Sequence, residues 1–458
     1  MELVLEHPDL IPFEPPPQPL GLRGLPTMWR NYIETIPRAA YEQQGVIRVR
    51  RRGSEVILVC EPELIGELLV DKAEAFRRDE VTRRSFAPVI GDSSLFLADG
   101  AEWRWQRRAV APIFRHETLL SFVPVIAATA ERQAERWRSL GDGAPTDVAA
   151  AMTRTTFDVI VETMLGGSAT LDADRYSRAL TASFETIPWH LIYAMFSLPE
   201  WMPFPHRREA MQARDFLHAD ISRIVGARRA KGASPRPDLL DLLLAARDPE
   251  GGRTMTDTEA MMNLLTFIIA GHETTAVALT WTLWLLAKDQ ATQQRVADEV
   301  AAVTGGKAIG PGETEGLNFS RQVIQEAMRL FPPAPAVSRH PKAAVVFGGI
   351  TLGPRTRVHV PIYALHRNAQ LWDAPNAFDP DRFAPDRAKA RSRYAYLPFG
   401  GGPRICIGAG FAMIEATAVL ATLIRAFRFH PVSGHKPKPL ARVTLRPEGG
   451  MPLHVTPR

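Results

Sequence analysis

Apolar and polar positions alternate with two different periods along the chain. From about Pro62 to Val300, apolar residues recur at three- and four-residue steps, which is the period of helices that bury one face. Two short apolar runs, Val46–Arg50 and Val56–Cys60, flank Arg51-Arg52-Gly53-Ser54 and predict a β-hairpin. Breaks in the helical period predict loops at Ala230–Asp238, Asp248–Arg253 and Gly305–Gly316.

After the helix around Glu326, the pattern changes to short β-rich segments separated by glycine and proline, at Val345–Phe347, Ile350–Leu352 and Arg357–Val360. A last helix is expected over Ala409–Phe427 and a β-rich tail over Ala441–Val455. The pattern therefore predicts a mainly α fold with a smaller β part, an α+β class. Because there is no internal repeat and no clean shift in composition, we expect one domain over residues 1–458. An extended, proline-rich entry segment is expected over residues 1–30.

The most apolar stretch, Met261–Ala287, carries His272 and Glu273 near its centre. A carboxylate there would be costly in a membrane-spanning helix, so the stretch predicts a buried helix with a polar site in its middle, and a membrane span is the minor alternative. The helix is expected to begin at a capping box, Thr256–Glu259, and to run to about Lys288. At about 1.5 Å per residue it is roughly 50 Å long, enough to cross the domain.

The composition narrows the classes of function. Of the 458 residues, 45% are hydrophobic and 23% charged, which excludes wholesale disorder and fibrous repeats. The 55 basic and 50 acidic residues give a net charge of +5, which permits an acidic partner but does not indicate nucleic acid. The only two cysteines, Cys60 and Cys406, exclude a disulfide-stapled fold. The N-terminus shows no signal peptide and no transmembrane anchor, so we expect a cytoplasmic protein.

The most informative stretch is Phe399-Gly400-Gly401-Gly402-Pro403-Arg404-Ile405-Cys406-Ile407-Gly408. Its three consecutive glycines permit positive φ angles and a close approach of the backbone to a large flat group. Cys406 precedes a helical pattern, so its thiolate gains from the helix dipole. One cysteine cannot hold zinc or an iron–sulfur cluster, whereas a single thiolate suits an axial site of haem. The alternative is an inert, buried cysteine, which is how we interpret Cys60.

This stretch resembles the haem-binding loop of the cytochrome P-450 superfamily of haem-thiolate monooxygenases, whose pattern is F-G-x-G-x-R-x-C-x-G. All six specified residue types are in place. The resemblance implies haem b as the cofactor, Cys406 as the ligand of its iron, and Phe399, Gly400 and Gly408 as residues that hold it. Four further motifs appear in the family's order. The resemblance therefore covers nearly the whole chain and implies the family's fold, with a long central helix over the haem.

One of these motifs, Ala270-Gly271-His272-Glu273-Thr274-Thr275, lies in the middle of the central helix. Glycine inside a helix costs about 1 kcal/mol relative to alanine, and such breaks of local rules are expected at functional sites. We interpret it as a local opening of the helix, with satisfied buried groups or a kink as alternatives. The segment resembles the family's A-G-x-[DE]-T-[TS] motif. That implies catalytic roles: Thr274 hydrogen-bonds to the reacting oxygen, and Glu273 helps to deliver protons. His272, at the variable position, is expected to be a pocket or packing residue.

A charged motif precedes the β-rich part. Glu326 and Arg329 are three residues apart and share a helix face. They resemble the family's E-x-x-R motif, whose partner is a later arginine, and Arg382 stands at that place. The family usually has glutamate before that arginine, where this chain has Asp381. We interpret the three residues as a structural network that supports the haem loop and is costly to break, because removing one member strands the others.

Four residues match the places where the family contacts the haem propionates. Trp103 and Arg107 are four apart on one helix face and form the family's W-x-x-x-R pair. Arg404 and Arg339 match two further places. Arginine suits a carboxylate because its guanidinium presents a planar fork of donors.

The haem domain leaves no segment for a flavin or iron–sulfur module, so electrons from NAD(P)H are expected through a separate protein. Basic residues predict a docking patch for an acidic ferredoxin or flavodoxin, formed by Arg387, Lys389, Arg391 and Arg393, with Arg104 and Arg108. A solvated charge run is an equally good interpretation, and for Arg104 and Arg108 the better one.

The segments that line the substrate pocket in the family are largely apolar here, which favours an apolar substrate: Phe86–Phe96, Phe184–Phe204, Phe267–Ala270 and Ala334–Val337. Much of the aromatic stretch 184–204 would serve equally well as core. The sequence Arg329–Pro335 resembles the fatty-acid-hydroxylating and eukaryotic-type branches, which favours a fatty-acyl, terpenoid or similar molecule.

Together these observations predict a monooxygenase that uses O2 to hydroxylate or epoxidise a lipophilic small molecule. The alternatives are a peroxide-driven haem-thiolate enzyme, a non-catalytic haem sensor or carrier, and a membrane-anchored protein. The intact Glu273–Thr274 pair argues against the first alternative, and the absence of an N-terminal anchor pattern argues against the last.

Overall fold

The computed structural model describes residues 14–17, 25–51, 54–141, 144–166, 171–195, 198–199, 201–234 and 237–458. Contacts divide the chain into two compact units whose segments alternate in sequence. The first unit contains Met1–Phe76, Leu120–Thr155 and Thr274–Arg458, and the second contains Arg77–Leu119 and Thr156–Glu273. The expectation of one domain stays a prediction.

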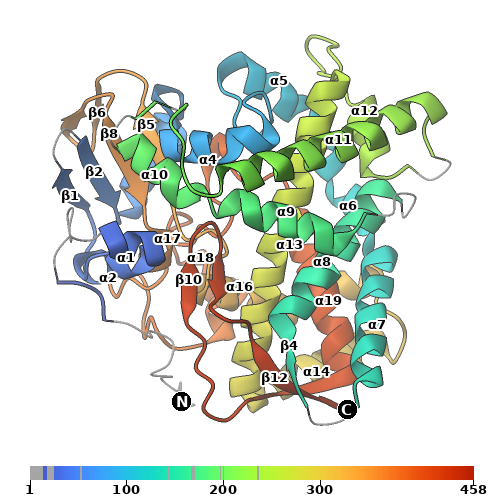
Figure 1. Ribbon diagram of the computed structural model, residues 1–458. Helices are drawn as coiled ribbons and strands as arrows, with labels where there is room; N and C mark the ends of the chain where they lie inside the picture. The colour runs from blue at the N-terminus through green and yellow to red at the C-terminus, as the bar shows by residue number, and fades with distance from the viewer. Residues whose placement is uncertain are drawn as a thin grey trace. The chain divides into compact units, whose positions relative to one another are not determined.

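The main sheet has the strand order β1-β2-β8-β5-β3, and its strands belong to the first unit except for the last two residues of β3. Its strands are β1 (Val46–Arg51), β2 (Ser54–Val59), β8 (Thr356–Val360), β5 (Val337–Pro341) and β3 (Phe76–Arg78). β1 and β2 form the predicted hairpin, with Val46 opposite Val59. β8 runs parallel to β2 and antiparallel to β5, so segments about 300 residues apart in sequence share one sheet (Figure 1).

Smaller sheets complete the β part of this unit. β6 (Val345–Phe347) and β7 (Ile350–Leu352) form a hairpin at the predicted positions. The β-rich tail contains β10 (Pro439–Ala441), β11 (Leu445–Pro447) and β12 (Pro452–Pro457). β12 pairs with β4 (Pro145–Asp147) and β9 (Phe427–Pro431).

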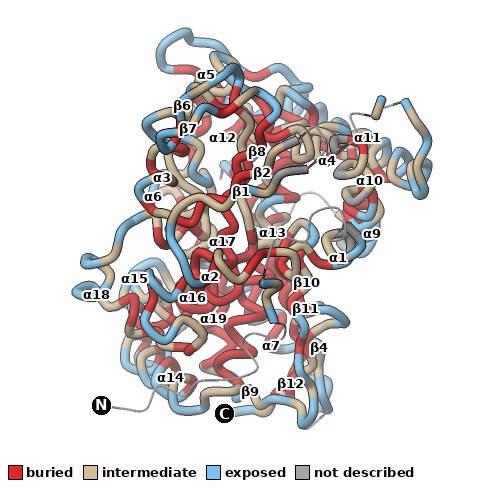
Figure 2. The backbone as a smooth tube through the Cα atoms, turned by 90° about the vertical axis from the view of Figure 1, so that its left-hand side faces the viewer, coloured by how far each residue is buried: buried red, intermediate tan, exposed pale blue. Residues whose placement is uncertain are grey.

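The first unit has a core on its sheet and a second, helical one. Every residue from Ile414 to Ile424 of α19 (Ala409–Ala426) is buried (Figure 2). α19 packs on α7 (Val123–Ser139), α14 (Gln290–Thr304) and α16 (Asn318–Leu330). The other helices here are short: α1 (Leu25–Arg30), α2 (Ala39–Glu42), α3 (Pro62–Gly66), α15 (Pro311–Gly316), α17 (Ile362–Leu365) and α18 (Pro385–Lys389).

The second unit is helical apart from the end of β3. It contains α4 (Glu80–Ile90), α5 (Gly100–Val110), α6 (His116–Leu120, whose last residue is in the first unit), α9 (Ala173–Phe184), α10 (Ile187–Met195), α11 (Arg207–Lys231) and α12 (Leu239–Ala245). It also contains most of α8 (Val148–Leu165) and the first half of α13 (Asp257–Lys288). The mainly α class with a smaller β part is thereby confirmed.

The central helix α13 begins as predicted. The Thr256 hydroxyl accepts from the Glu259 N–H at 3.2 Å, and the Glu259 carboxylate accepts from the Thr256 N–H at 2.8 Å. By length and composition α13 and α19 would each be able to cross a membrane, and 67% of the most apolar window of each is buried inside the protein.

Two predicted segments differ from the structure. The expected loop Gly305–Gly316 contains α15, which starts at Pro311 and is capped by Glu313 accepting from the Gly310 N–H at 3.1 Å. Proline is well tolerated at a first helical position, so this glycine-rich segment still supports one turn of helix. The expected extended entry segment ends in a helix, α1; residues 1–13 and 18–24 lie outside the described residues.

Candidate functional site

The cysteine loop leads directly into α19. The Cys406 N–H donates to the Phe399 carbonyl at 3.0 Å, which closes the loop, and Gly408 is the N-cap of the helix. The Cys406 side chain is exposed, whereas Cys60 is completely buried and burial raises the pKa of its thiol to about 12. Cys60 is therefore the inert thiol, and Cys406 is presented at a helix N-terminus.

The loop glycines are required by the chain's own geometry. Gly400 has φ of 72° and Gly402 has φ of 69°, in the region that favours glycine. A Cβ on Gly402 would lie 1.8 Å from the Leu69 carbonyl oxygen, in the helical turn η4 (Glu67–Asp71). The close approach expected of these glycines is, at Gly402, an approach to the protein's own backbone.

The donor set fits a haem held by one thiolate. Within the described residues, no group of three or more His, Cys, Asp or Glu is placed to hold a metal ion. The exposed sulfur of Cys406 is thus presented without the additional ligands that zinc or an iron–sulfur cluster needs.

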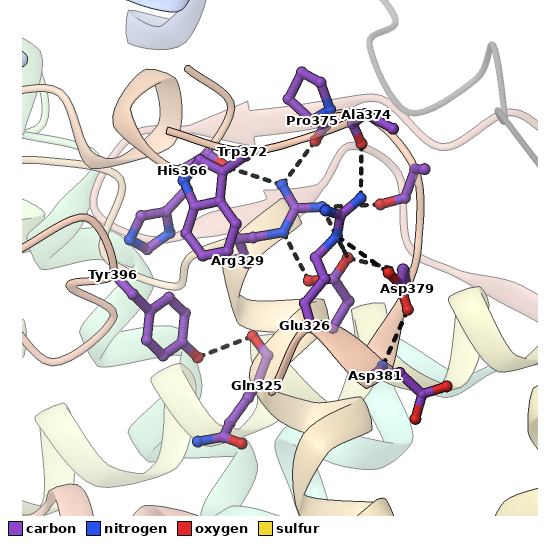
Figure 3. Close-up of polar contacts among 12 residues, drawn as sticks. Gln325, Glu326, Arg329, His366, Trp372, Ala374, Pro375, Asp379, Asp381 and Tyr396 are labelled. Atoms are coloured by element: carbon purple, nitrogen blue, oxygen red, sulfur yellow. Dashed lines mark hydrogen bonds and ion pairs between the residues drawn. The ribbon is translucent and has the colours of Figure 1, made fainter. Parts of the chain in front are cut away.

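The predicted charged network forms a buried cluster (Figure 3). Arg329 donates through Nε and Nη2 to the two oxygens of Glu326, at 2.7 and 2.8 Å. Its remaining donors reach the carbonyls of His366, Pro375 and Ala377 at 2.7–2.8 Å. All five guanidinium N–H groups are used, and both charged side chains have zero exposure.

Arg382 joins the same cluster. Its Nε lies 3.4 Å from a Glu326 oxygen, and its Nη2 donates to the Ala374 carbonyl at 2.9 Å. The Asp379 N–H also donates to Glu326, at 2.9 Å. The three predicted residues therefore lie together.

Asp381, which stands where the family usually has glutamate, lies outside the buried cluster. Asp381 forms an exposed, bidentate pair with Arg295 at 2.8 and 2.9 Å. An exposed pair contributes little to stability, so shortening glutamate to aspartate here leaves the network intact.

Two bonds connect the cluster to the segment that enters the cysteine loop. The Leu397 N–H donates to His366 Nε2 at 2.8 Å, and the Tyr396 hydroxyl donates to the Gln325 carbonyl at 2.9 Å. Burial, together with the positive charges of Arg329 and Arg367, lowers the pKa of His366 to about 3. His366 is therefore neutral and accepts at Nε2. The network's support of the loop runs through this histidine, which the sequence analysis did not single out.

The Glu273–Thr274 motif lies on the accessible face of the middle section of α13. Between Asn263 and Ala287 the residues that are not buried are Phe267, Ala270, Gly271, Glu273 and Thr274. Positions 267, 270, 271 and 274 follow the spacing of a single helix face. Between Asn263 and Ala287, the otherwise buried helix is therefore open along the face that carries Thr274. The helix assignment is continuous across the motif.

In the second unit, a polar network holds α5, which carries Trp103 and Arg107. Asn263, fully buried on α13, accepts from the Leu95 N–H at 2.8 Å and donates to Gln106 of α5 at 2.9 Å. Trp103 and Arg107 are half-buried on one side of this helix. Their spacing places both side chains on the same face, as predicted.

The two other arginines expected at the propionates belong to the first unit. Arg339 is half-buried in β5, where its Nη1 donates to the Ser338 carbonyl at 2.9 Å. Arg404 is half-buried in the short turn η8 (Gly402–Arg404) of the cysteine loop.

Three residues that hold the site through long-range hydrogen bonds were not predicted from the sequence. His366 and Asn263 each accept a hydrogen bond from a backbone N–H far along the chain, and Asp379 donates its own backbone N–H to the Glu326 carboxylate. A polar residue at a buried position in an apolar helix was the available signal for Asn263. Carbonyl acceptors carry no sequence signal at all.

The family model described as Cytochrome P450 matches residues 15–453. The chain is 32% identical over 406 residues to cyclooctatin synthase from Streptomyces melanosporofaciens, covering 87% of this chain and 86% of that protein. It is 29% identical over 411 residues to cyclooctat-9-en-7-ol 5-monooxygenase from the same organism, covering 89% and 87%. Among solved structures, the heme domain of cytochrome P450DA matches with a TM-score of 0.79 and 26% identity, covering 90% of each chain. The chain therefore belongs to the cytochrome P450 family of haem-dependent monooxygenases.

Proposed function

We propose that this monooxygenase binds haem b through Cys406 and inserts one oxygen atom from O2 into a lipophilic small molecule by hydroxylation or epoxidation. The observation that carries the proposal is the exposed thiol of Cys406 at the N-terminus of α19, in a loop supported by a fully partnered buried ion pair. The helix dipole and the free N–H groups of the first turn favour the thiolate form.

When bound, the haem supplies the oxygen-activating chemistry, and the protein supplies orientation and control of protons. Arg107, Trp103, Arg404 and Arg339 would hold the propionates, since each is half-buried and able to donate. Phe399, Gly400 and Gly408 would shape the loop on the cysteine side.

Glu273 and Thr274 are the proposed catalytic pair. Thr274 presents a hydroxyl on the accessible face of α13, and Glu273 stands beside it with a carboxylate that can take up and release a proton. Ala270, one helical turn before Thr274 on that face, is small and exposed, which leaves room for a reacting molecule.

The two cysteines provide a matched test of the iron ligand. In haem-replete protein, Cys406→Ala should abolish the ferrous–carbon monoxide absorption typical of a thiolate ligand, whereas Cys60→Ala should leave it unchanged. A Cys406→Ala protein with the wild-type spectrum would refute the assignment. The Cys60 variant separates a lost ligand from a general loss of folding.

Two substitutions of Thr274 test the Glu273–Thr274 pair, one that removes the hydroxyl and one that retains it. Thr274→Ala should keep haem but release more hydrogen peroxide for each NAD(P)H oxidised, and Thr274→Ser should restore coupling. Full coupling in Thr274→Ala would remove Thr274 from the mechanism.

For the substrate we propose a terpenoid or fatty-acyl molecule. Aromatic residues of the expected pocket segments in the second unit contact other aromatic residues. Phe86 contacts Phe96 and Phe184 edge-to-face, and Phe267 contacts Phe114, with ring centroids 5.3–6.0 Å apart. Part of the stretch 184–204 is core instead, since buried Tyr193 packs on Phe204 and donates to the Pro203 carbonyl. Phe196 lies outside the described residues.

One similar protein is named for oxidising cyclooctat-9-en-7-ol, which supports the terpenoid class. Titrating the ferric protein with this alcohol, a long-chain fatty acid and a polar control should move the Soret band with one lipophilic class only. A Soret band that none of the lipophiles moves would contradict the proposed substrate class.

For the electron donor we propose an acidic ferredoxin or flavodoxin that docks by the cysteine loop. The basic patch is smaller than the sequence suggests. Arg387 pairs with Asp379 at 3.0 Å, and Arg391 donates to the Arg382 carbonyl and lies over Trp372. Both arginines are therefore bound to residues in or beside the buried cluster. Arg108, expected to be solvated, pairs with Asp248 at 2.9 Å.

Of the basic residues just before the cysteine loop, exposed Lys389 and Arg393 remain as the charged contacts. Ile405, 42% exposed beside Cys406, offers an apolar contact. Lys389→Glu and Arg393→Glu should slow reduction by an acidic ferredoxin several-fold at low salt, with the difference shrinking as salt rises. Lys307→Glu, an exposed lysine between α14 and α15, is the control. Equal rates in all three variants would sink the docking proposal.

A further inference from the structure

Within the second unit, α8 contacts α13 at the two residues that precede Glu273 and Thr274. The hydroxyl of Thr156 on α8 donates to the carbonyl oxygen of His272 on α13 at 2.8 Å. Thr156 has zero exposure and His272 is 4% exposed. This is a buried, side-chain-to-backbone bond between two helices, at a residue next to Glu273.

α8 and α13 pack closely at this crossing. A Cβ on Gly271 would lie 2.7 Å from Ile160 Cδ1 of α8, and Phe157 contacts the His272 ring edge-to-face at 5.7 Å. Thr156, Phe157 and Ile160 thus all contact α13 at positions 271 and 272. The glycine of the motif is explained by this contact, which lets α8 approach the helix backbone.

The His272 side chain adds a second bond of the same kind. Its Nδ1 lies 2.8 Å from the Ile268 carbonyl, one helical turn earlier. Burial lowers the pKa of His272, so the ring is neutral and donates from Nδ1. The carbonyls of Ile268 and His272, one helical turn apart on α13, therefore accept hydrogen bonds from side chains in addition to those of the helix backbone. Such bonds tilt carbonyls and bend helices.

The bond to His272 acts on Glu273 through covalent geometry. The carbonyl of His272 and the N–H of Glu273 belong to one planar peptide unit. Holding that carbonyl restrains the orientation of the peptide unit that ends at the Cα atom of Glu273, and the next residue along the helix is Thr274. Small displacements of catalytic groups are expensive, because about 1 Å of misplacement can cost about 100-fold in rate.

We infer that Thr156 is a positioning residue for the Glu273–Thr274 pair, which it orients by donating its hydroxyl to the His272 carbonyl. The inference rests on the proposed function, in which this pair manages protons at the haem. A threonine that only filled space would be replaceable by valine, which has the same shape and no hydroxyl.

The test uses four variants in the haem-loaded protein. Thr156→Val and Thr156→Ala remove the donor, and Thr156→Ser retains it. Thr163→Val is the matched control, because Thr163 is also buried on α8 but its hydroxyl donates within its own helix, to the Val159 carbonyl at 2.7 Å. The haem spectrum of each variant reports whether it has folded.

Two measurements report on the position of the Glu273–Thr274 pair and require neither the substrate nor the electron donor. The first is the C–O stretching band of the ferrous protein with carbon monoxide as probe, which is sensitive to nearby polar groups. The second is hydrogen exchange of the α13 amides from Glu273 to Val277. We expect Thr156→Val and Thr156→Ala to shift the band and to speed exchange several-fold, and Thr156→Ser and Thr163→Val to match the wild type.

The outcomes separate this inference from the function on which it rests. A wild-type band and wild-type exchange in Thr156→Val would overturn the positioning role, as would equal changes in Thr156→Val and Thr156→Ser. If Thr274→Ala itself leaves the band unmoved, the proposed place of the pair beside the haem fails, whatever the Thr156 variants do.

Discussion

Two fully buried carboxyl groups of the first unit, Glu326 and Glu415, lie in contrasting surroundings. Glu326 accepts two bonds from Arg329 and one from the Asp379 N–H, with Arg382 nearby. Among the described residues, no hydrogen bond of standard geometry reaches either oxygen of Glu415 in α19. Burial raises the pKa of Glu415 well above its usual range, although the nearby Thr275 hydroxyl partly opposes this.

The difference shows how one fold keeps two carboxyl groups in its core by opposite means. A buried charge is tolerated when paired and hydrogen-bonded, and otherwise the group becomes neutral. The Glu326 cluster is therefore an ionic support of the cysteine loop, whereas burial shifts Glu415 toward its neutral form. Removing a partner should harm the first region far more than removing the charge harms the second.

The largest effect is expected from Arg329→Leu. It leaves Glu326 buried without its main partner, which costs about 3–5 kcal/mol of unfolding free energy. Haem retention should fall with it, because the cluster supports the loop through His366 and Tyr396. Denaturant unfolding and haem content are the measurements.

Arg321→Leu on the same helix is the control for this prediction. Arg321 is half-buried and donates one bond, to the Thr314 carbonyl at 3.3 Å. It should lose no more than about 1 kcal/mol. Equal losses in the two variants would show that the ionic cluster has no special role.

His366 should make the first region acid-sensitive. Its pKa is about 3 in the folded protein and 6.5 by reference, so the unfolded chain binds the extra proton as pH falls below 6.5. The unfolding free energy should therefore drop by about 1.4 kcal/mol per pH unit between about 6 and 3.

His366→Gln should flatten that slope, because the glutamine amide oxygen can accept from Leu397 without titrating. Comparing unfolding curves at pH 7 and pH 5 measures the effect. An unchanged slope in His366→Gln would assign the acid sensitivity to other groups.

The smallest effect is expected from Glu415→Gln at pH 5, below about 1 kcal/mol, because a neutral amide replaces a neutral acid. The pH trend should run opposite to that of His366. With its pKa raised, Glu415 favours the folded state at low pH and loses this contribution as pH rises above 4.5, the reference value of the unfolded chain.

Glu415→Gln removes that loss, so its stability relative to wild type should grow from pH 5 to pH 8 in unfolding experiments. A variant that instead becomes relatively less stable with rising pH would mean that Glu415 is ionised in the folded protein.

Much of the fold and the site was predictable, because local patterns carry the information. The hairpin, the capping box at Thr256 and the boundaries of α19 follow from short-range periodicity and capping. The Glu326–Arg329 pair follows from three-residue spacing on a helix. Resemblance added Arg382, for which spacing alone gives no reason.

The bonds from distant elements were not predictable. Arg329 uses three backbone carbonyls between positions 366 and 377, and Thr156 uses the carbonyl of His272. Carbonyls are present at every residue, so no residue type marks the ones that will accept. Gly402 shows the same limit, since the sequence indicates a close approach but not that its neighbour is Leu69.

By itself the sequence determined the helical framework, the thiol at the start of α19 and the motif residues of α13, because hydrophobic period, caps and residue chemistry act locally. The tertiary structure decided which thiol is accessible, which face of α13 is open, and which buried acid is paired or neutral. The physical reason is that accessibility and charge state depend on what surrounds a group in space, and those surroundings come from segments that are far apart in the chain.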